Sequence, residues 1–149
     1  MEVSVSVNVN APREKTFQIF NEYEHIEERI GGLKAVTINT DMPPGPGFSW
    51  TETRELYGRE ASETMTIEDW DAPKSLTVVA ESHGTKYKSF FDYEETETGT
   101  RVTMRFTGTP QTFMAKIMGF FMGSMMRKSI VGLLEKDLQD LKQYIEGGE

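Results

Sequence analysis

The stretch that decides the fold is QTFMAKIMGFFMGSMMRKSIVGLLEKDLQDLKQYIE, residues 111–146. Its apolar residues recur at intervals of three and four, which is the period of an amphipathic α-helix. Pro110 precedes the segment, so we expect one helix that begins after this proline and ends at Glu146. At ~1.5 Å per residue such a helix is ~50 Å long, which is enough to cross a whole domain.

The two halves of this expected helix differ in composition. Residues 114–126 hold five of the nine methionines, two phenylalanines and a single charge, Lys116. Methionine adapts to irregular space and varied guests, whereas the leucine, isoleucine and valine of the second half have better-defined rotamers. We therefore interpret the leucine half as packed core and the methionine half as a deformable cavity wall. Plain core, or contact with a membrane or a protein partner, are the alternatives for the methionine half.

The rest of the chain is mostly β in pattern. Valine at every second position of residues 3–9 predicts a strand with one buried face. Residues 10–20 and 22–30 have the pattern of two short helices, the second ending at Gly31-Gly32. Six segments bounded by turn residues then predict strands, at 33–40, 47–57, 60–70, 74–82, 86–95 and 100–108.

These elements predict an α+β fold. Turn signals recur with no long helix between the strands, which favours antiparallel hairpins over βαβ units. The apolar face of a seven-stranded antiparallel sheet needs a cover, and only the long helix is large enough. We expect a curved seven-stranded sheet wrapped around the long C-terminal helix, with two short helices after the first strand, as a single domain over residues 1–149.

Composition excludes several classes of function. The chain has no cysteine, which excludes disulfides, thiolate metal sites and a cysteine nucleophile. Its net charge of −8 argues against nucleic acid and anionic membrane surfaces as partners. His25 and His83 lie in separate elements, so we expect no metal site, and no cofactor motif is present. Without a signal peptide or a membrane-spanning run, we expect a cytoplasmic protein with no stable membrane insertion.

Several short motifs, together with the order of elements, carry a family resemblance. They are AP at Ala11-Pro12, GRE at Gly58–Glu60, DAP at Asp71–Pro73 and GTRV at Gly99–Val102. Over its whole length the chain resembles the SRPBCC superfamily, the START-related, helix-grip group that includes polyketide cyclase-like proteins. The motifs mark turns and helix starts, so they support the fold better than an activity. The resemblance implies a deep cavity between sheet and long helix for a hydrophobic or amphipathic small molecule.

Strand alternation then suggests which side chains face this cavity. If Trp50 points inward, so do Glu52 and Arg54, which would pair with each other or with a polar ligand group; a bulge would instead place them in solvent. Tyr87 and Tyr93 each offer an apolar body with one polar tip. The predicted ligand-binding residues are Trp50, Glu52, Arg54, Met65, Ile67, Val78, Tyr87, Phe91, Tyr93, Met104, Met114, Met118, Phe121, Met122 and Met125.

The function predicted from these residues is binding of a lipid-like or polycyclic aromatic molecule. One alternative is a polyketide cyclase or dehydratase that uses the same cavity, marked by converging acid and base groups such as Glu52 and Tyr93. Another is a protein-interaction module, for which a homodimer formed through the Met/Phe segment would fit. No nucleophile elbow, HExxH or phosphate-binding loop is present, so the sequence assigns no catalytic residue.

Overall fold

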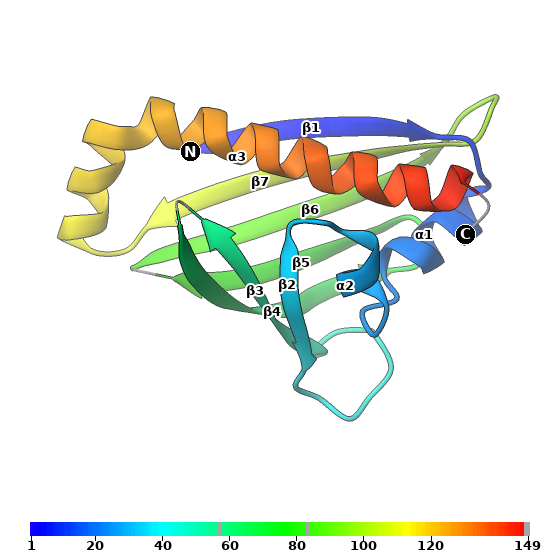
Figure 1. Cartoon of the computed structure of the whole chain (residues 1–149), viewed down its shortest axis with the longest axis horizontal. Coiled ribbons are helices and arrows are strands. Elements are labelled where there is room, and N and C mark those ends of the chain that lie inside the picture. The colour runs from blue at the N-terminus through cyan, green and yellow to red at the C-terminus, as the bar shows by residue number, and fades with distance from the viewer. Residues whose placement is uncertain (57, 83, 148–149) are drawn as a thin grey trace.

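The chain forms one antiparallel sheet, two short helices and one very long helix (Figure 1). The computed structural model describes residues 1–56, 58–82 and 84–147, apart from the side chains of Leu56, Met118, Phe121, Met122 and Met126. The elements in chain order are β1 (Glu2–Val9), α1 (Arg13–Phe20), α2 (Ile26–Arg29), β2 (Leu33–Ile38), β3 (Ser49–Leu56), β4 (Arg59–Asp71), β5 (Ser75–Ser82), β6 (Thr85–Glu95), β7 (Thr100–Pro110) and α3 (Phe113–Glu146).

The sheet has seven strands in the order β1-β7-β6-β5-β4-β3-β2, all antiparallel to their neighbours. Six of the strands, β2 to β7, pair in the order in which they follow one another along the chain. β1 lies at the edge of the sheet and pairs with the last strand, β7, from Glu2 opposite Thr107 to Val9 opposite Thr100. β1 alternates strictly between exposed and buried residues, as its valine pattern predicts. The observed elements confirm the helix-grip fold expected from the sequence.

Local backbone features give the sheet its curvature. The register of strand pairing shifts between Leu33 and Ala35, and again between Ile67 and Asp69. Such bulges bend a strand and increase its twist. Gly58 and Gly84 precede strands at hairpin turns with φ of +78° and +75°, a left-handed conformation that favours glycine. The curved sheet therefore presents a concave face toward α3.

The long helix α3 lies along β1 and across this concave face (Figure 1). Its C-terminal end is fixed to the end of β1, because the backbone N–H of Asn10 donates to Glu146 at 2.8 Å and Lys142 donates to the Asn8 carbonyl at 2.7 Å. Figure 1 shows the first turns of α3 running at a steep angle to the remainder of the helix. Only the later turns therefore cover the sheet.

The hydrophobic core lies where β1, α1 and the second half of α3 meet. Phe17 and Phe20 of α1 are buried together with Leu134 and Leu138 of α3 and the inward valines of β1. Phe17 and Phe20 both pack edge-on against the ring of Tyr93, with centroids 4.9 and 5.7 Å apart. This core fixes the C-terminal part of α3 and does not fill the space over the central strands.

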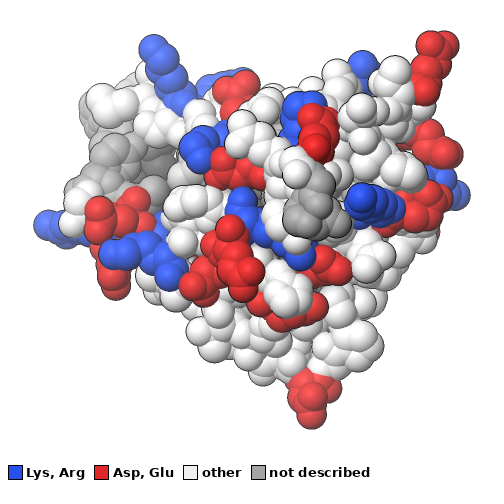
Figure 2. Space-filling view, turned by 45° about the vertical axis from the view of Figure 1, so that its right-hand side comes forward, with Lys and Arg blue, Asp and Glu red and all other residues white. Residues whose placement is uncertain are grey.

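Charged side chains of both signs are interspersed over the face seen in Figure 2. Some charged side chains of the sheet form ion pairs that reach over an intervening strand, such as Lys88 of β6 with Glu68 of β4 at 3.0 Å and Lys34 of β2 with Glu60 of β4 at 3.2 Å. Exposed pairs of this kind contribute little to stability, typically ~0–1 kcal/mol. Of the helices described, none combines the length and the hydropathy needed to cross a bilayer.

Candidate functional site

A cavity of about 550 Å³ lies between the concave face of the sheet and the helices. Its walls come from β3 to β7 on one side and from α1, the α1–α2 segment and α3 on the other. The lining residues are Phe20, Asn21, Tyr23, Ile26, Ile30, Trp50, Glu52, Arg54, Glu55, Ala61, Glu63, Met65, Val78, Tyr87, Ser89, Phe91, Tyr93, Met104, Phe106, Ser129, Ile130, Leu133, Leu134, Asp137, Leu138 and Leu141. Most of them are apolar, so the space suits a hydrophobic guest.

Aromatic rings form part of this wall. Tyr23 stacks on Trp50 with ring centroids 4.0 Å apart and on Phe48 at 5.2 Å. On the neighbouring strands, Tyr87 stacks on Phe106 at 5.4 Å. Stacked rings are large and rigid, so they hold their shape around an empty space better than flexible side chains do.

One group of polar side chains interrupts the apolar wall; we call Glu52, Arg54 and Asp137 the carboxylate cluster. Arg54 donates to both oxygens of Asp137, at 3.2 and 2.7 Å, and its Nη2 lies 3.5 Å from Oε1 of Glu52. The indole N–H of Trp50 donates to the other Glu52 oxygen at 3.0 Å. The three charged side chains are only 14 to 15 % exposed. The sheet and α3 are thus joined across the cavity by a bidentate ion pair.

A second polar group lies nearer to α1. Asn21 donates to the Phe17 carbonyl at 2.8 Å and to the Tyr93 hydroxyl oxygen at 3.4 Å, and it accepts from the Tyr23 hydroxyl at 2.7 Å. Burial raises the pKa of Tyr93 and of Tyr23 well above the ordinary tyrosine value. Both hydroxyls are therefore protonated across the physiological range.

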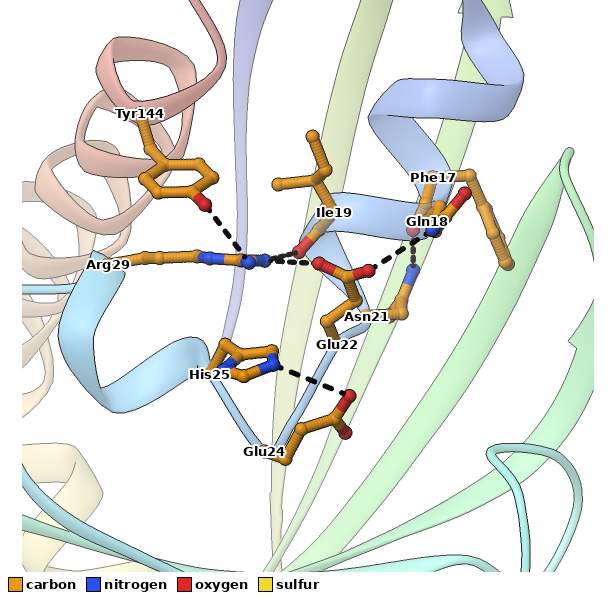
Figure 3. Close-up of polar contacts among 9 residues, drawn as sticks. All are labelled: Phe17, Gln18, Ile19, Asn21, Glu22, Glu24, His25, Arg29 and Tyr144. Carbon is orange, nitrogen blue, oxygen red and sulfur yellow. Dashed lines mark hydrogen bonds and ion pairs between the residues drawn. The ribbon is translucent and has the colours of Figure 1, made fainter. Parts of the chain in front are cut away.

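The end of the cavity next to α1 and α2 is held in place by Arg29 (Figure 3). Its guanidinium donates to the Ile19 carbonyl at 3.0 Å, to Glu22 at 2.7 Å and to the Tyr144 hydroxyl at 3.2 Å. Burial acts to raise the pKa of Glu22, but hydrogen bonds from Arg29 and Gln18 outweigh it and lower that pKa. One cation thus connects α1, α2 and the last turn of α3.

Nine of the residues predicted to bind a ligand line the cavity. They are Trp50, Glu52, Arg54, Met65, Val78, Tyr87, Phe91, Tyr93 and Met104. Their side chains share the cavity face of the sheet because every second residue of a strand points to the same side. Ile67 differs: it is buried in the core at 1 % exposure and does not line the cavity. The pairing of β3 with β4 runs without a shift through Met65 and Thr66, so Ile67 keeps the inward phase of Met65 but is covered by the core.

The ligand-binding residues predicted on α3 agree least with the structure. Met114 and Met125 lie on the surface, 66 and 67 % exposed, and do not line the cavity. The predictions for Met118, Phe121 and Met122 fall on side chains outside the described residues. Among the described side chains of α3, those that line the cavity begin at Ser129 and continue through the leucine half. The prediction is therefore wrong for Met114 and Met125, and the leucine half, which we expected to be core alone, lines the cavity as well.

Sequence reasoning missed Asp137, the α3 partner of Arg54. An aspartate on an amphipathic helix ordinarily faces solvent, and the sequence also offers Asp137 no sign of a distant partner, since its neighbours Lys136 and Asp140 pair with each other at i, i+4, 2.7 Å apart. The available signal was the inward phase of Arg54, since a half-buried guanidinium requires an acidic partner. Glu52 and Tyr93, the acid and base groups named for the alternative of a cyclase, both line the cavity, and each hydrogen-bonds to another residue: Glu52 accepts from Trp50 and Tyr93 accepts from Asn21.

The comparisons with known proteins identify the family. Residues 1–146 match the family model described as "Polyketide cyclase / dehydrase and lipid transport". The chain belongs to this family. The match extends over nearly every element described above and confirms the resemblance inferred from the short motifs. No curated protein matches the chain.

Solved structures share the fold at low sequence identity. TTHA0849 from Thermus thermophilus superposes with a TM-score of 0.84 at 14 % identity, covering 100 % of this chain and 99 % of that one. Ara h 8.0201 gives 0.71 at 13 % identity, with 99 and 98 % covered. The di-domain ARO/CYC StfQ from the steffimycin biosynthetic pathway gives 0.82 at 12 % identity, and this chain, 98 % covered, spans 51 % of its length. At these identities the likeness shows the fold alone.

Proposed function

We propose that this protein binds an apolar or amphipathic small molecule, lipid-like or polycyclic aromatic, in the cavity between the sheet and α3. The observation that carries the proposal is the space of about 550 Å³ with a mainly apolar wall. Ligand pockets in proteins commonly have ~300–1,000 Å³ and a few polar groups among apolar ones. The carboxylate cluster and the Asn21–Tyr93 pair are among the polar groups of this wall.

The driving force for binding is burial of apolar surface. Removing apolar area from water contributes ~25 cal/mol per Å². A guest that buries roughly 300 Å² would therefore gain about 7.5 kcal/mol, before the cost of association is subtracted. Affinities in the micromolar range need about 8 kcal/mol, so a well-fitting ring system or acyl chain is required.

The experiment uses N-phenyl-1-naphthylamine, an uncharged probe that fluoresces in apolar surroundings. We expect saturable binding to the purified protein. Ser89→Trp, which places a large ring in the cavity wall, should reduce affinity at least tenfold. Lys88→Trp is the matched control, because the adjacent residue on β6 has a side chain 54 % exposed and should bind the probe normally. Equal binding by the two variants would contradict a site inside the cavity.

A cyclase or dehydratase is the second candidate function. It is supported by the buried carboxylates on the cavity wall and by the family description, and two solved neighbours are described as di-domain ARO/CYC proteins. A cyclase would convert a bound poly-ketone chain to a ring product with loss of water, and Glu52→Gln should slow that conversion. The two candidate functions are separated by an experiment on protein purified from its own host. The small molecule that it carries is extracted with organic solvent and identified by mass spectrometry, and it is identified again after incubation with the protein. A carrier returns its guest unchanged.

A further inference from the structure

The charged side chains that line the cavity are unbalanced in sign. Of the described lining residues, four carry carboxyl groups, namely Glu52, Glu55, Glu63 and Asp137, and the only cationic one is Arg54. Glu55 lies near the exposed end of β3, where Lys34 is 3.5 Å away. Glu52 and Asp137 are mostly buried and share the one guanidinium between them. The polar part of the cavity is thus acidic.

Arg54 is not available to hold an anionic ligand. Asp137 takes both Nη atoms, and Glu52 lies beside the same Nη2. A ligand carboxylate that approached the guanidinium would have to displace Asp137 or stand next to two carboxylates at once. Like charges brought together in a partly desolvated site repel strongly.

The ionisation of the cluster agrees with an excess of negative charge. Burial raises the pKa of Asp137, and although Arg54 acts to lower it, the nearby carboxylates of Glu52 and Asp140 add to the rise. Burial acts to lower the pKa of Arg54, but Asp137 and Glu52 more than reverse this and raise it. Asp140, itself only 14 % exposed, is paired with Lys136 at 2.7 Å and accepts from the Gly31 N–H at 2.9 Å. An acidic surrounding raises the pKa of acids and bases alike.

A separate observation concerns Tyr93, which lines the cavity at 2 % exposure. Its hydroxyl oxygen accepts from Asn21, but within residues 1–56, 58–82 and 84–147 no acceptor is present for its own proton. Buried hydroxyl donors are ordinarily satisfied by protein, water or ligand. A ligand oxygen that accepts from Tyr93 would complete this bond.

We infer that the carboxylate cluster acts as a ligand filter, which admits uncharged molecules bearing a hydroxyl donor and rejects carboxylates and phosphates. This inference rests on the proposed function, since it concerns the same cavity. Carboxylate oxygens of Glu52 and Asp137 accept from the donor on the guest, and Tyr93 donates to an oxygen elsewhere on it. The substrate class is therefore phenols, polyols or hydroxy-ketones rather than free fatty acids or acyl phosphates.

The test is displacement of N-phenyl-1-naphthylamine at pH 7 by three molecules that share one ring system. They are 2-naphthol, which is an uncharged donor, 2-methoxynaphthalene, which is uncharged without a donor, and 2-naphthoate, which is an anion. We expect naphthol to bind at least threefold tighter than the methyl ether and at least tenfold tighter than naphthoate. Naphthoate that binds as tightly as naphthol would overturn the filter while leaving the proposed function intact. Absence of probe binding would overturn both.

Variants locate the effect in the cluster. Glu52→Gln keeps Arg54 paired with Asp137 and should improve naphthoate binding at least fivefold relative to naphthol. Asp137→Asn should do so more strongly, because it frees Arg54 for the anion; circular dichroism shows whether it is folded. Glu94→Gln is the matched control, since this glutamate has a side chain 64 % exposed and does not line the cavity. An equal gain in the control variant would refute the assignment to Glu52 and Asp137.

Discussion

The two halves of α3 have opposite surroundings. In the first half, residues 113–128, large apolar side chains face water: Phe113, Met114, Phe120 and Met125 are 66 to 85 % exposed. In the second half, residues 129–146, Leu134, Leu138 and Leu141 are buried and also line the cavity. The first half is the more apolar of the two in sequence, yet the second half closes the ligand space. What a helix residue contacts is thus decided by where the helix lies, not by residue type alone.

The length of β1 explains where the boundary falls. β1 has 8 residues, which at ~3.4 Å each span ~27 Å. The same distance accommodates ~18 helical residues at ~1.5 Å each. Because Glu146 is fixed to Asn10 at the end of β1, counting back this number along α3 leads to residue 129. Of the side chains of α3 that the structure describes, the first to line the cavity is Ser129, in agreement with this geometric limit.

The largest effect expected from this contrast is on stability. Leu138→Ala should lower the free energy of unfolding by ~2–5 kcal/mol, since Leu138 is 2 % exposed and truncation leaves a void. Met125→Ala should change it by less than ~0.5 kcal/mol, because the side chain is 67 % exposed. Urea denaturation followed by circular dichroism measures both. A loss of several kcal/mol in the Met125 variant would show that the first half is covered in solution.

The next effect concerns the polar contacts that hold the last turn of α3. Arg29→Ala removes three hydrogen bonds and a cation–π contact in which the guanidinium carbon lies 4.2 Å from the centroid of the Tyr144 ring. We expect a loss of ~2–3 kcal/mol, because the Glu22 carboxylate and the Ile19 carbonyl lose a charged donor. The matched control is Arg127→Ala in the exposed first half, with a change below ~0.5 kcal/mol. Similar losses in both would contradict the contrast.

A smaller effect on stability is expected at alkaline pH. It tests whether water is excluded from the surroundings of Tyr93, in the part of the cavity that the second half of α3 covers. Unfolded tyrosine loses its proton near pH 10, whereas burial raises the pKa of Tyr93 and Tyr23 in the folded protein. Above pH 10 the unfolded state therefore binds fewer protons, and stability falls as pH rises, by ~1.4 kcal/mol per pH unit for each tyrosine.

Urea denaturation between pH 9 and 11 measures this slope. Tyr93→Phe should reduce it by about one proton, or ~1.4 kcal/mol per pH unit. The same slope in wild type and variant would mean that Tyr93 titrates freely, and hence that water fills its surroundings. Absorbance at 295 nm reports tyrosinate formation independently.

Much of the fold could be predicted because its patterns are local. Alternating valines define β1, and the inward phase of Trp50 correctly carries Glu52 and Arg54 to the cavity wall. The overhang of α3 could also have been derived, since it follows from comparing the lengths of a strand and a helix. The sequence reasoning instead weighed residue type, and methionine is common both at adaptable cavity walls and at exposed contact surfaces.

Other features depend on contacts between distant segments and have no local signature. Asp137 turns inward only because Arg54, 83 residues earlier, lies beneath it. Ile67 has the inward phase of Met65, but it is 1 % exposed and covered by the core, so it does not reach the cavity. Neither the covering of one inward residue by distant core residues nor the partner of a half-buried arginine is visible in periodicity, so the site could be predicted only strand by strand.

The smallest expected effect compares glycines in the two halves. No described atom lies within 4 Å of a Cβ built on Gly123 or on Gly132, so alanine fits at both positions. Alanine is favoured over glycine inside a helix by ~1 kcal/mol. Gly132→Ala should therefore raise the global stability by ~0.5–1 kcal/mol, because the second half unfolds together with the core. Gly123→Ala should raise it by less than ~0.3 kcal/mol, because the large apolar side chains described in its half face water, and we therefore expect this half to unfold before the core does.

Amide hydrogen exchange provides the complementary measurement. The first half should exchange faster than the second in the wild type, and Gly123→Ala should slow exchange in residues 113–128 without affecting the second half. Gly132→Ala should leave the exchange of the first half unchanged. If Gly123→Ala raised the global stability as much as Gly132→Ala, the two halves would unfold as one unit. The geometric limit set by β1 would then not be the boundary between a closing helix and an exposed extension.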